Sequence, residues 1–192
     1  MSFKSIYYSL PVKIRKYIHV KLGPIIYDIE KSFVSSNIGK SYGLTKSDRI
    51  KIVNRVLKIL KNVKSATNLN VHLTLLSRVL EMPASKETSY LVEAGSYFGA
   101  SACTLSIAAQ ILNKKLIIYD SFSGLPGNDD KDLKIFTHLG VKGFYKKGMY
   151  AASRKIVEKN IKEYGEYHCC IFREGHFEKT MLNHSEKFVF YF

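Results

Sequence analysis

The stretch Tyr90-Leu-Val-Glu-Ala-Gly95-Ser-Tyr-Phe-Gly99-Ala-Ser101 decides the fold of this chain of 192 residues. Its first half is a short apolar run that ends in glycine, as a buried strand of a parallel sheet does. Its second half leads into the small and apolar segment 101–112, which predicts a helix. A strand that turns through glycine into a helix begins a βαβ unit, so the sequence predicts a parallel sheet with right-handed crossovers.

The rest of the C-terminal half continues this alternation. Three further apolar runs predict buried strands, at residues 115–120, 168–173 and 187–192. A helical segment at residues 151–164 lies between the first and second of these runs, and another at residues 177–182 lies between the second and third. Gly165 after the longer helix is typical of a left-handed helix cap. We therefore expect an α/β fold with a Rossmann-like sheet, helices on both faces, and residues 90–94 and 116–120 as its central strands.

Residues 1–85 differ in texture and predict a helical extension, or lid, in front of a sheet domain at residues 86–192. Thr45 followed by Asp48 resembles a helix capping box, and apolar residues follow at helical spacing. A second helix is expected at about residues 69–80, before Pro83. We expect these helices to lie beside the ligand site.

The net charge of +14 is concentrated in this extension. Residues 1–64 contain 14 Lys and Arg against 3 Asp and Glu, whereas the remainder contains 16 against 13. Such a segment can make weak contact with an anionic membrane surface, or it can be a solvated face; we expect no specific nucleic-acid partner. The sequence shows no secretory signal, and its three cysteines match neither a zinc nor a disulfide pattern, which predicts free thiols in a reducing cytoplasm.

A glycine turn and an acid at the end of the next strand form a candidate ligand site. Ligands of such sheets bind beyond the carboxyl ends of the strands, so Gly95, Asp120 and Gly175 should converge there. Gly95 lets a ligand approach the backbone, and Asp120 can accept hydrogen bonds from both hydroxyls of a ribose. Tyr97 stands where a dinucleotide motif has its second glycine, which argues against a pyrophosphate ligand. The alternatives are a purely structural turn at Gly95 and a loop cap at Asp120.

At this point the sequence resembles a known family. Asp120-Ser-Phe-Ser-Gly-Leu-Pro126 resembles the Asp-Ser-Phe-Glu-Gly-Leu-Pro motif of macrocin O-methyltransferase-like (TylF/MycF-type) enzymes. The pattern Glu93-x-Gly95-x-x-x-Gly99-x-Ser101 is similar to their first motif. Lys147-Gly-Met-Tyr150 and Gly175-His-Phe-Glu-Lys-Thr180 match further on, although Lys179 departs from the family's Asp. The matches extend over about residues 42–192.

The resemblance implies a class I fold that binds S-adenosylmethionine and transfers its methyl group to a hydroxyl of a sugar or another small molecule. Carried over by position, Glu93, Gly95 and Ser101 would line the methionine end, Asp120 would hold the ribose, and Gly175 and His176 would border the adenine. The predicted cofactor-binding set also contains Gly99, Ser121 and Phe122. His176 can equally be an exposed loop histidine.

Family members continue past the fourth strand into an Asp-x-Asp segment that resembles a magnesium site. This chain ends at Phe192, so we expect a truncated remnant that keeps the donor site and lacks the metal and acceptor site. Asp129, Asp130 and Asp132 read as a solvated loop rather than as metal ligands. Two other functions stay open, a non-catalytic nucleoside-binding module and a basic surface-binding protein acting through residues 1–64; a homo-oligomer is open too.

Overall fold

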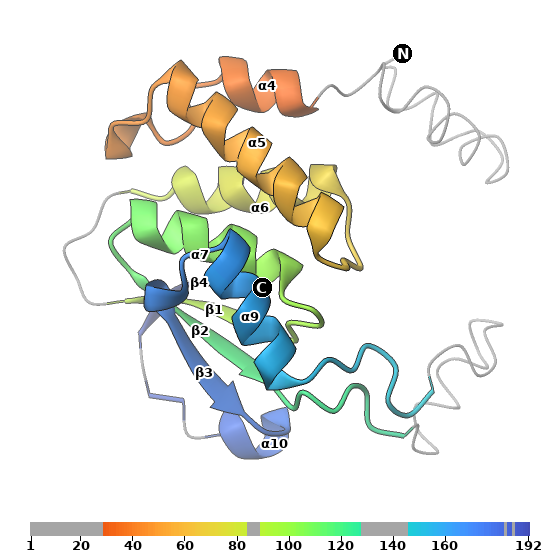
Figure 1. Cartoon of the computed structure of the whole chain (residues 1–192). Helices are drawn as coiled ribbons and strands as arrows, with labels where there is room; N and C mark the ends of the chain where they lie inside the picture. Colours follow the sequence, from red (N-terminus) through yellow and green to blue (C-terminus); the bar gives the residue numbers. More distant parts are fainter. Residues whose placement is uncertain (1–28, 84–88, 128–145, 183, 186) are drawn as a thin grey trace, which may run out of the picture.

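The computed structural model describes residues 29–83, 89–127, 146–182, 184–185 and 187–192, which form a parallel sheet under a layer of helices (Figure 1). The strands are β1 (Tyr90–Ala94), β2 (Lys115–Asp120), β3 (Cys170–Glu174) and β4 (Phe188–Tyr191). They lie in the order β3-β2-β1-β4, and every pairing is parallel. This is the order of the first four strands in a doubly wound sheet. The predicted Rossmann-like sheet, with β1 and β2 at its centre, is confirmed.

The two faces of the sheet carry helices of very different size. α7 (Ala100–Ile111) connects β1 to β2 and α9 (Arg154–Tyr164) connects β2 to β3, so the chain steps twice in the same direction. Right-handed crossovers in one direction place both helices on one face. The return from β3 to β4 places α10 (Phe177–Thr180) on the other face, where Met181 packs on a small cluster of Val92, Ile117 and Tyr119. Helices therefore lie on both faces, as expected, but the second face has one short helix in the described ranges.

Helix α7 lies at the centre of the molecule and is buried on nearly every side. Its small side chains let neighbouring segments approach closely. A Cβ atom at Gly165 would lie 2.6 Å from the Ser106 Oγ atom and 3.0 Å from the Cys103 Cα atom. Gly165 has an extended backbone with a φ of −112°. The predicted left-handed cap is therefore wrong, and the glycine is required because the chain passes so near α7.

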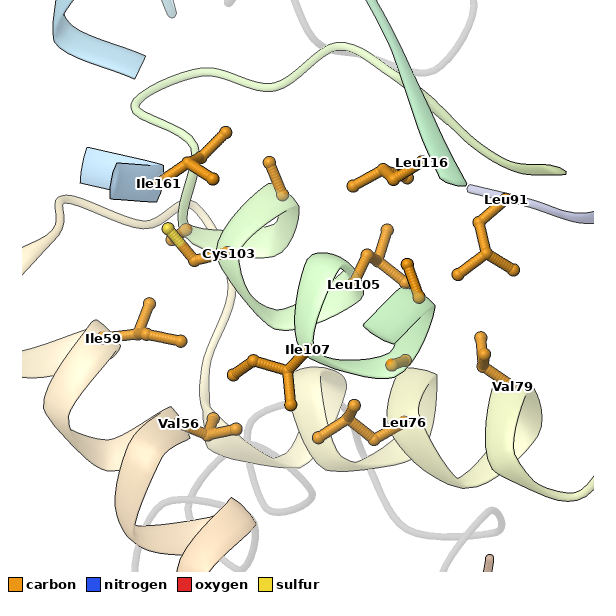
Figure 2. Packing of buried hydrophobic residues seen from close by; sticks show 14 of the residues in the cluster. Val56, Ile59, Leu76, Val79, Leu91, Cys103, Leu105, Ile107, Leu116 and Ile161 are labelled. Carbon is orange, nitrogen blue, oxygen red and sulfur yellow. The ribbon is translucent and has the colours of Figure 1, made fainter. Parts of the chain in front are cut away.

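The N-terminal helices α4 (Ile29–Ser35), α5 (Lys46–Asn62) and α6 (Leu69–Leu80) complete the helical layer, and a 3-10 turn spans Lys40–Tyr42. Figure 2 shows Val56 and Ile59 of α5 and Leu76 of α6 around Ile107 of α7. These residues belong to the same hydrophobic cluster as Leu116 of β2. The described parts of 1–85 and 86–192 thus share one core, and the division between them stays a prediction.

Local signals explain where two of these elements begin. The predicted capping box of α5 is present, because the Asp48 amide donates to the Thr45 hydroxyl at 3.2 Å and the Thr45 amide donates to the Asp48 carboxylate at 3.0 Å. A 3-10 turn at Tyr167–Cys169 delays β3 by two residues relative to the prediction. The helices expected before residue 29 lie outside the described residues.

The three cysteines carry free thiols, as expected, with Cys103 and Cys169 buried and Cys170 half-buried. Burial raises the pKa of Cys170 to about 12, so this thiol is not ionised near neutral pH. Within the described ranges, no helix has the length and apolar character needed to cross a membrane.

Candidate functional site

A cavity of about 380 Å³ opens at the carboxyl ends of β1, β2 and β3. Each strand contributes the loop that follows it, and the connection between α5 and α6 adds Ala66. The lining residues are Ala66, Ala94, Gly95, Tyr97, Asp120, Ser121, Gly124, Leu125, Pro126, Tyr150, Gly175, His176, Phe177 and Glu178. Its size and mainly apolar wall with a few polar groups are typical of small-molecule sites.

Asp120 holds the first two loops of the cavity together. One of its carboxylate oxygens accepts hydrogen bonds from the Ser96 amide at 2.6 Å and the Ser96 hydroxyl at 2.8 Å, and the other accepts from the Phe122 amide at 2.7 Å. The loop-capping role considered from the sequence is therefore real. A carboxylate has about four acceptor positions, so the second oxygen keeps capacity for a ligand.

The backbone around the cavity adopts conformations that bulky residues rarely take. Tyr97, Phe122 and Tyr150 have φ angles of 50°, 53° and 61°, and Asn113 is the one other non-glycine residue in the described ranges with a positive φ. Such backbone costs about 1–3 kcal/mol per residue and persists where the surroundings impose it, commonly at ligand sites. Three of these residues lie at or next to one cavity, which favours it as the candidate functional site.

The loop after β2 is fixed against the segment that leads to α9. The Leu125 amide donates to the Met149 carbonyl at 2.9 Å, and the Gly148 amide donates to the Leu125 carbonyl at 2.9 Å. A Cβ atom at Gly124 would lie 2.5 Å from the Met149 carbonyl oxygen. Glycine is required because the two backbones approach so closely, and their contact brings Tyr150 to the cavity.

Two tyrosine rings of the cavity wall contact each other, and a lysine lies against one of them. The rings of Tyr97 and Tyr150 meet edge to face with their centroids 5.3 Å apart. The ammonium group of Lys64 lies 5.6 Å from the Tyr97 ring centroid and 5.5 Å from that of Phe98. Lys64 and Ala66 both belong to the connection between α5 and α6, so this connection lies beside the cavity.

Glu93 lies behind the cavity wall. Its side chain is fully buried, one oxygen accepts a hydrogen bond from the Ser101 hydroxyl, and the other has no hydrogen-bond partner in the described structure. Burial raises the pKa of Glu93 to about 8; the Ser101 hydrogen bond opposes this shift and the nearby Asp120 charge adds to it. Glu93 is therefore mainly protonated at neutral pH, since desolvation disfavours the ionised form.

The structure divides the nine residues that the sequence assigns to cofactor binding into two groups. Five line the cavity, namely Gly95, Asp120, Ser121, Gly175 and His176, and His176 is exposed there. The other four are not among the lining residues, namely Glu93, Gly99, Ser101 and Phe122. For all nine residues, a role in cofactor binding stays a prediction.

Several lining residues are not predicted from the sequence. The motifs contain Leu125 and Phe177 but assign them no role, and the sequence predicts for Tyr97 only that its bulk excludes a pyrophosphate. Ala66 lies far away in the sequence and carries no motif. The position of Tyr97 between Gly95 and Gly99 is the sequence signal that could have identified it, because glycine is common in strained turns.

A metal site is not assembled by the described residues. No three His, Cys, Asp or Glu side chains within them come together as metal ligands. Asp129, Asp130 and Asp132 lie outside the described residues.

No protein-family model matches this chain, and no curated protein sequence matches it. Among solved structures, the O-methyltransferase NovP is 18% identical and covers 71% of this chain and 48% of its own, with a TM-score of 0.41. The calicheamicin methyltransferase CalS11 is 17% identical and covers 69% of this chain and 60% of its own, with a TM-score of 0.36. The chain thus spans about half the length of NovP. At these scores the likeness decides neither ligand nor reaction, and the macrocin-type resemblance stays a prediction.

Proposed function

We propose that the cavity binds S-adenosylmethionine and that the chain is the donor-binding part of an O-methyltransferase for sugar or small-molecule hydroxyls. The observation that carries this proposal is the place of Asp120, which lines the cavity at the end of β2 beside the glycine turn at Gly95. An acid at that place in a Rossmann-like sheet suits ribose hydroxyls. Tyr97 leaves no second glycine at which a pyrophosphate could approach the backbone.

The residues present fit such a donor. A Cβ atom added at Gly95 would meet nothing within 4 Å, so the backbone there is open to a ligand. Asp120 would hold the ribose, Gly175 and His176 would border the adenine, and the Glu93–Ser101 pair would support the turn at the methionine end. S-adenosylmethionine supplies a methyl group on a positively charged sulfur, which an acceptor oxygen can attack.

Transfer to a hydroxyl also requires that the acceptor oxygen be deprotonated. An alcohol is a weak nucleophile near neutral pH, so a base or a bound metal must assist it. The resemblance implies a magnesium ion for this role in the full-length family, but the described residues form no group to hold it, so we expect this chain to bind the donor and to transfer methyl groups poorly or not at all. Donor binding is therefore tested first, and transfer second.

Calorimetric titration with S-adenosylhomocysteine, the stable product, tests the donor site. Asp120→Asn keeps the shape of the side chain but removes its charge, and we expect about 1.5–3 kcal/mol weaker binding, which is tenfold or more. Ser96→Ala is the matched control, because it removes one hydrogen bond to Asp120 and leaves the carboxylate in place. Equal affinity of the unaltered chain and Asp120→Asn would remove Asp120 from the site.

A second comparison separates blocked access from backbone strain. Gly95 and Gly43 both have a positive φ, and an added Cβ atom would meet nothing at either position, but Gly43 lies away from the cavity. We expect Gly95→Ala to weaken donor binding and Gly43→Ala to leave it unchanged.

The same protein samples distinguish the other two functions. Donor binding without transfer of a radiolabelled methyl group to any acceptor with magnesium present would favour a nucleoside-binding module. Salt-sensitive binding to anionic vesicles that is unchanged in Asp120→Ala would favour a basic surface-binding protein.

A further inference from the structure

A buried histidine lies beneath the connection between α5 and α6 that reaches the cavity. His72 of α6 is fully buried. Its Nδ1 atom lies 2.7 Å from the Thr104 hydroxyl of α7, and its Nε2 atom lies 3.0 Å from the Thr67 hydroxyl and 3.3 Å from the Ser65 hydroxyl. Both sides of the ring are therefore engaged, one with the central helix and one with residues 63–68, which we call the 63–68 connection.

The neighbours of His72 assign its protons. The Thr104 hydroxyl donates to the Ala100 carbonyl at 3.2 Å, so it accepts from the ring and Nδ1 carries the hydrogen. The Ser65 hydroxyl donates to the Thr67 carbonyl at 2.9 Å. This leaves the Thr67 hydroxyl to donate to Nε2. Burial lowers the pKa of His72 to about 4, so the ring is neutral near pH 7 and Nε2 is an acceptor.

The two partners of the ring lead to two walls of the cavity. Thr104 and Ala100 form the first turn of α7, which begins directly after the Gly99 turn. The 63–68 connection contributes Ala66 to the cavity wall and holds the Lys64 ammonium group over the Tyr97 and Phe98 rings. His72 is thus a bridge between α7, which begins at the glycine turn after β1, and the 63–68 connection, which contributes Ala66 to the wall.

We propose that His72 is a positioning residue for the cavity, which accepts a hydrogen bond from Thr67 and thereby fixes the 63–68 connection, and Ala66 with it, relative to the glycine turn. Both nitrogens of a buried imidazole need hydrogen-bond partners, and here one partner lies on α7 and the other on the 63–68 connection, so the ring ties these two segments together. Of the two readouts that test this role, only the affinity for S-adenosylhomocysteine rests on the proposed function.

Two substitutions at His72 separate its two hydrogen bonds. A glutamine side chain reaches about as far as Nε2, and its carbonyl oxygen can accept the Thr67 hydroxyl. An asparagine side chain reaches only as far as Nδ1, so His72→Asn keeps the contact with Thr104 and loses the contact with Thr67. Thr67→Val removes the same hydrogen bond from the other end with little change in volume, and it serves if His72→Asn does not fold.

The matched control is Val79→Ala, which creates a cavity in the same helix. Val79 is fully buried near the end of α6, whereas His72 lies in its first turn. At 1.5 Å per residue the two positions are about 10 Å apart along the helix. Val79→Ala therefore loosens the core without touching the 63–68 connection.

Two readouts are measured on the full chain, S-adenosylhomocysteine affinity and amide hydrogen exchange of residues 63–68 without ligand. We expect His72→Asn and Thr67→Val to bind about threefold to tenfold more weakly, the effect of losing one buried hydrogen bond, and to exchange faster at 63–68. His72→Gln should have the affinity and the exchange rate of the unaltered chain. Val79→Ala should change neither the affinity nor the exchange of residues 63–68. Unchanged exchange and affinity in His72→Asn and Thr67→Val, or equal loosening in Val79→Ala, would overturn the proposal. Faster exchange without any ligand binding by the unaltered chain would support the positioning role and reject the donor site.

Discussion

The core beneath the helices and the loops at the strand ends keep their shapes by different means. Leu105, Ile107 and Leu116 have at most 1% of their surface exposed and are fixed by close packing from every side. The loops around the cavity rely instead on polar contacts such as those of Asp120, and on backbone angles that tyrosine rarely adopts. Packing free energy therefore resides in the first region, and the second stores strain that a ligand site can use.

The largest effect expected from this contrast is in the core. Leu105→Ala removes a fully buried side chain from α7 and should lower the free energy of unfolding by about 2–5 kcal/mol in urea titration. Leu182→Ala is the control, since Leu182 is 80% exposed and its loss should change stability by less than about 0.5 kcal/mol. Similar losses for both variants would show that α7 is not the centre of the core.

Glu93 lies on the border of the two regions and should make stability depend on pH. Its pKa is raised from 4.5 to about 8 in the folded state, so the folded chain binds more protons between these values and stability falls as the pH rises. The slope reaches at most about 1.4 kcal/mol per pH unit. Urea titrations at several pH values should show this decline in the natural chain and its loss in Glu93→Gln.

The informative window for Glu93 is pH 6.5 to 8. The pKa of His72 is lowered from 6.5 to about 4, so His72 adds stability as the pH rises from 4 to 6.5 and masks part of the Glu93 effect there. Above pH 6.5 this histidine is mainly neutral in both states. A natural chain whose stability does not decline between pH 6.5 and 8 relative to Glu93→Gln would mean that Glu93 is ionised.

In the strand-end loops, a small change should affect binding more than stability. Gly124→Ala would place a Cβ atom against the Met149 carbonyl and force apart two segments at the cavity. The backbone strain at this residue should rise by about 1–3 kcal/mol. Gly43→Ala introduces the same left-handed strain with no neighbour within 4 Å. Calorimetry should therefore show weaker S-adenosylhomocysteine binding in Gly124→Ala only. Equal affinities would place the ligand elsewhere.

The smallest expected effect is at the cap of α5, far from the cavity. Thr45→Ala removes the capping box and should lower stability by about 1 kcal/mol. Ser47→Ala, in the same exposed turn, should leave it nearly unchanged. Neither variant should alter ligand affinity, and a change in affinity with Thr45→Ala would show that the two regions are coupled through α5.

The sequence predicted those features that depend on local pattern. The apolar runs at β1 and β2, the glycine turn and the Thr45–Asp48 cap each follow from a few neighbouring residues. The unequal faces of the sheet follow instead from the strand order, which no single run reveals. Tyr150 lies at the cavity next to the long-range contact of Leu125 with Met149, and Ala66 reaches the cavity through the packing of α5 and α6 on α7. Such long-range effects leave no local signal.

The position of β4 beside β1 has a consequence for how the chain folds. β1 pairs with β2, which follows it closely, but its other edge pairs with β4, the last of the described strands, with Tyr90 opposite Phe188. Closing so long a loop is slow, because its entropy is lost before the pairing rewards it. Until β4 docks, β1 offers an open edge to other chains. The final docking step therefore competes with aggregation, and solubility during refolding should depend on how fast residues 187–192 reach β1.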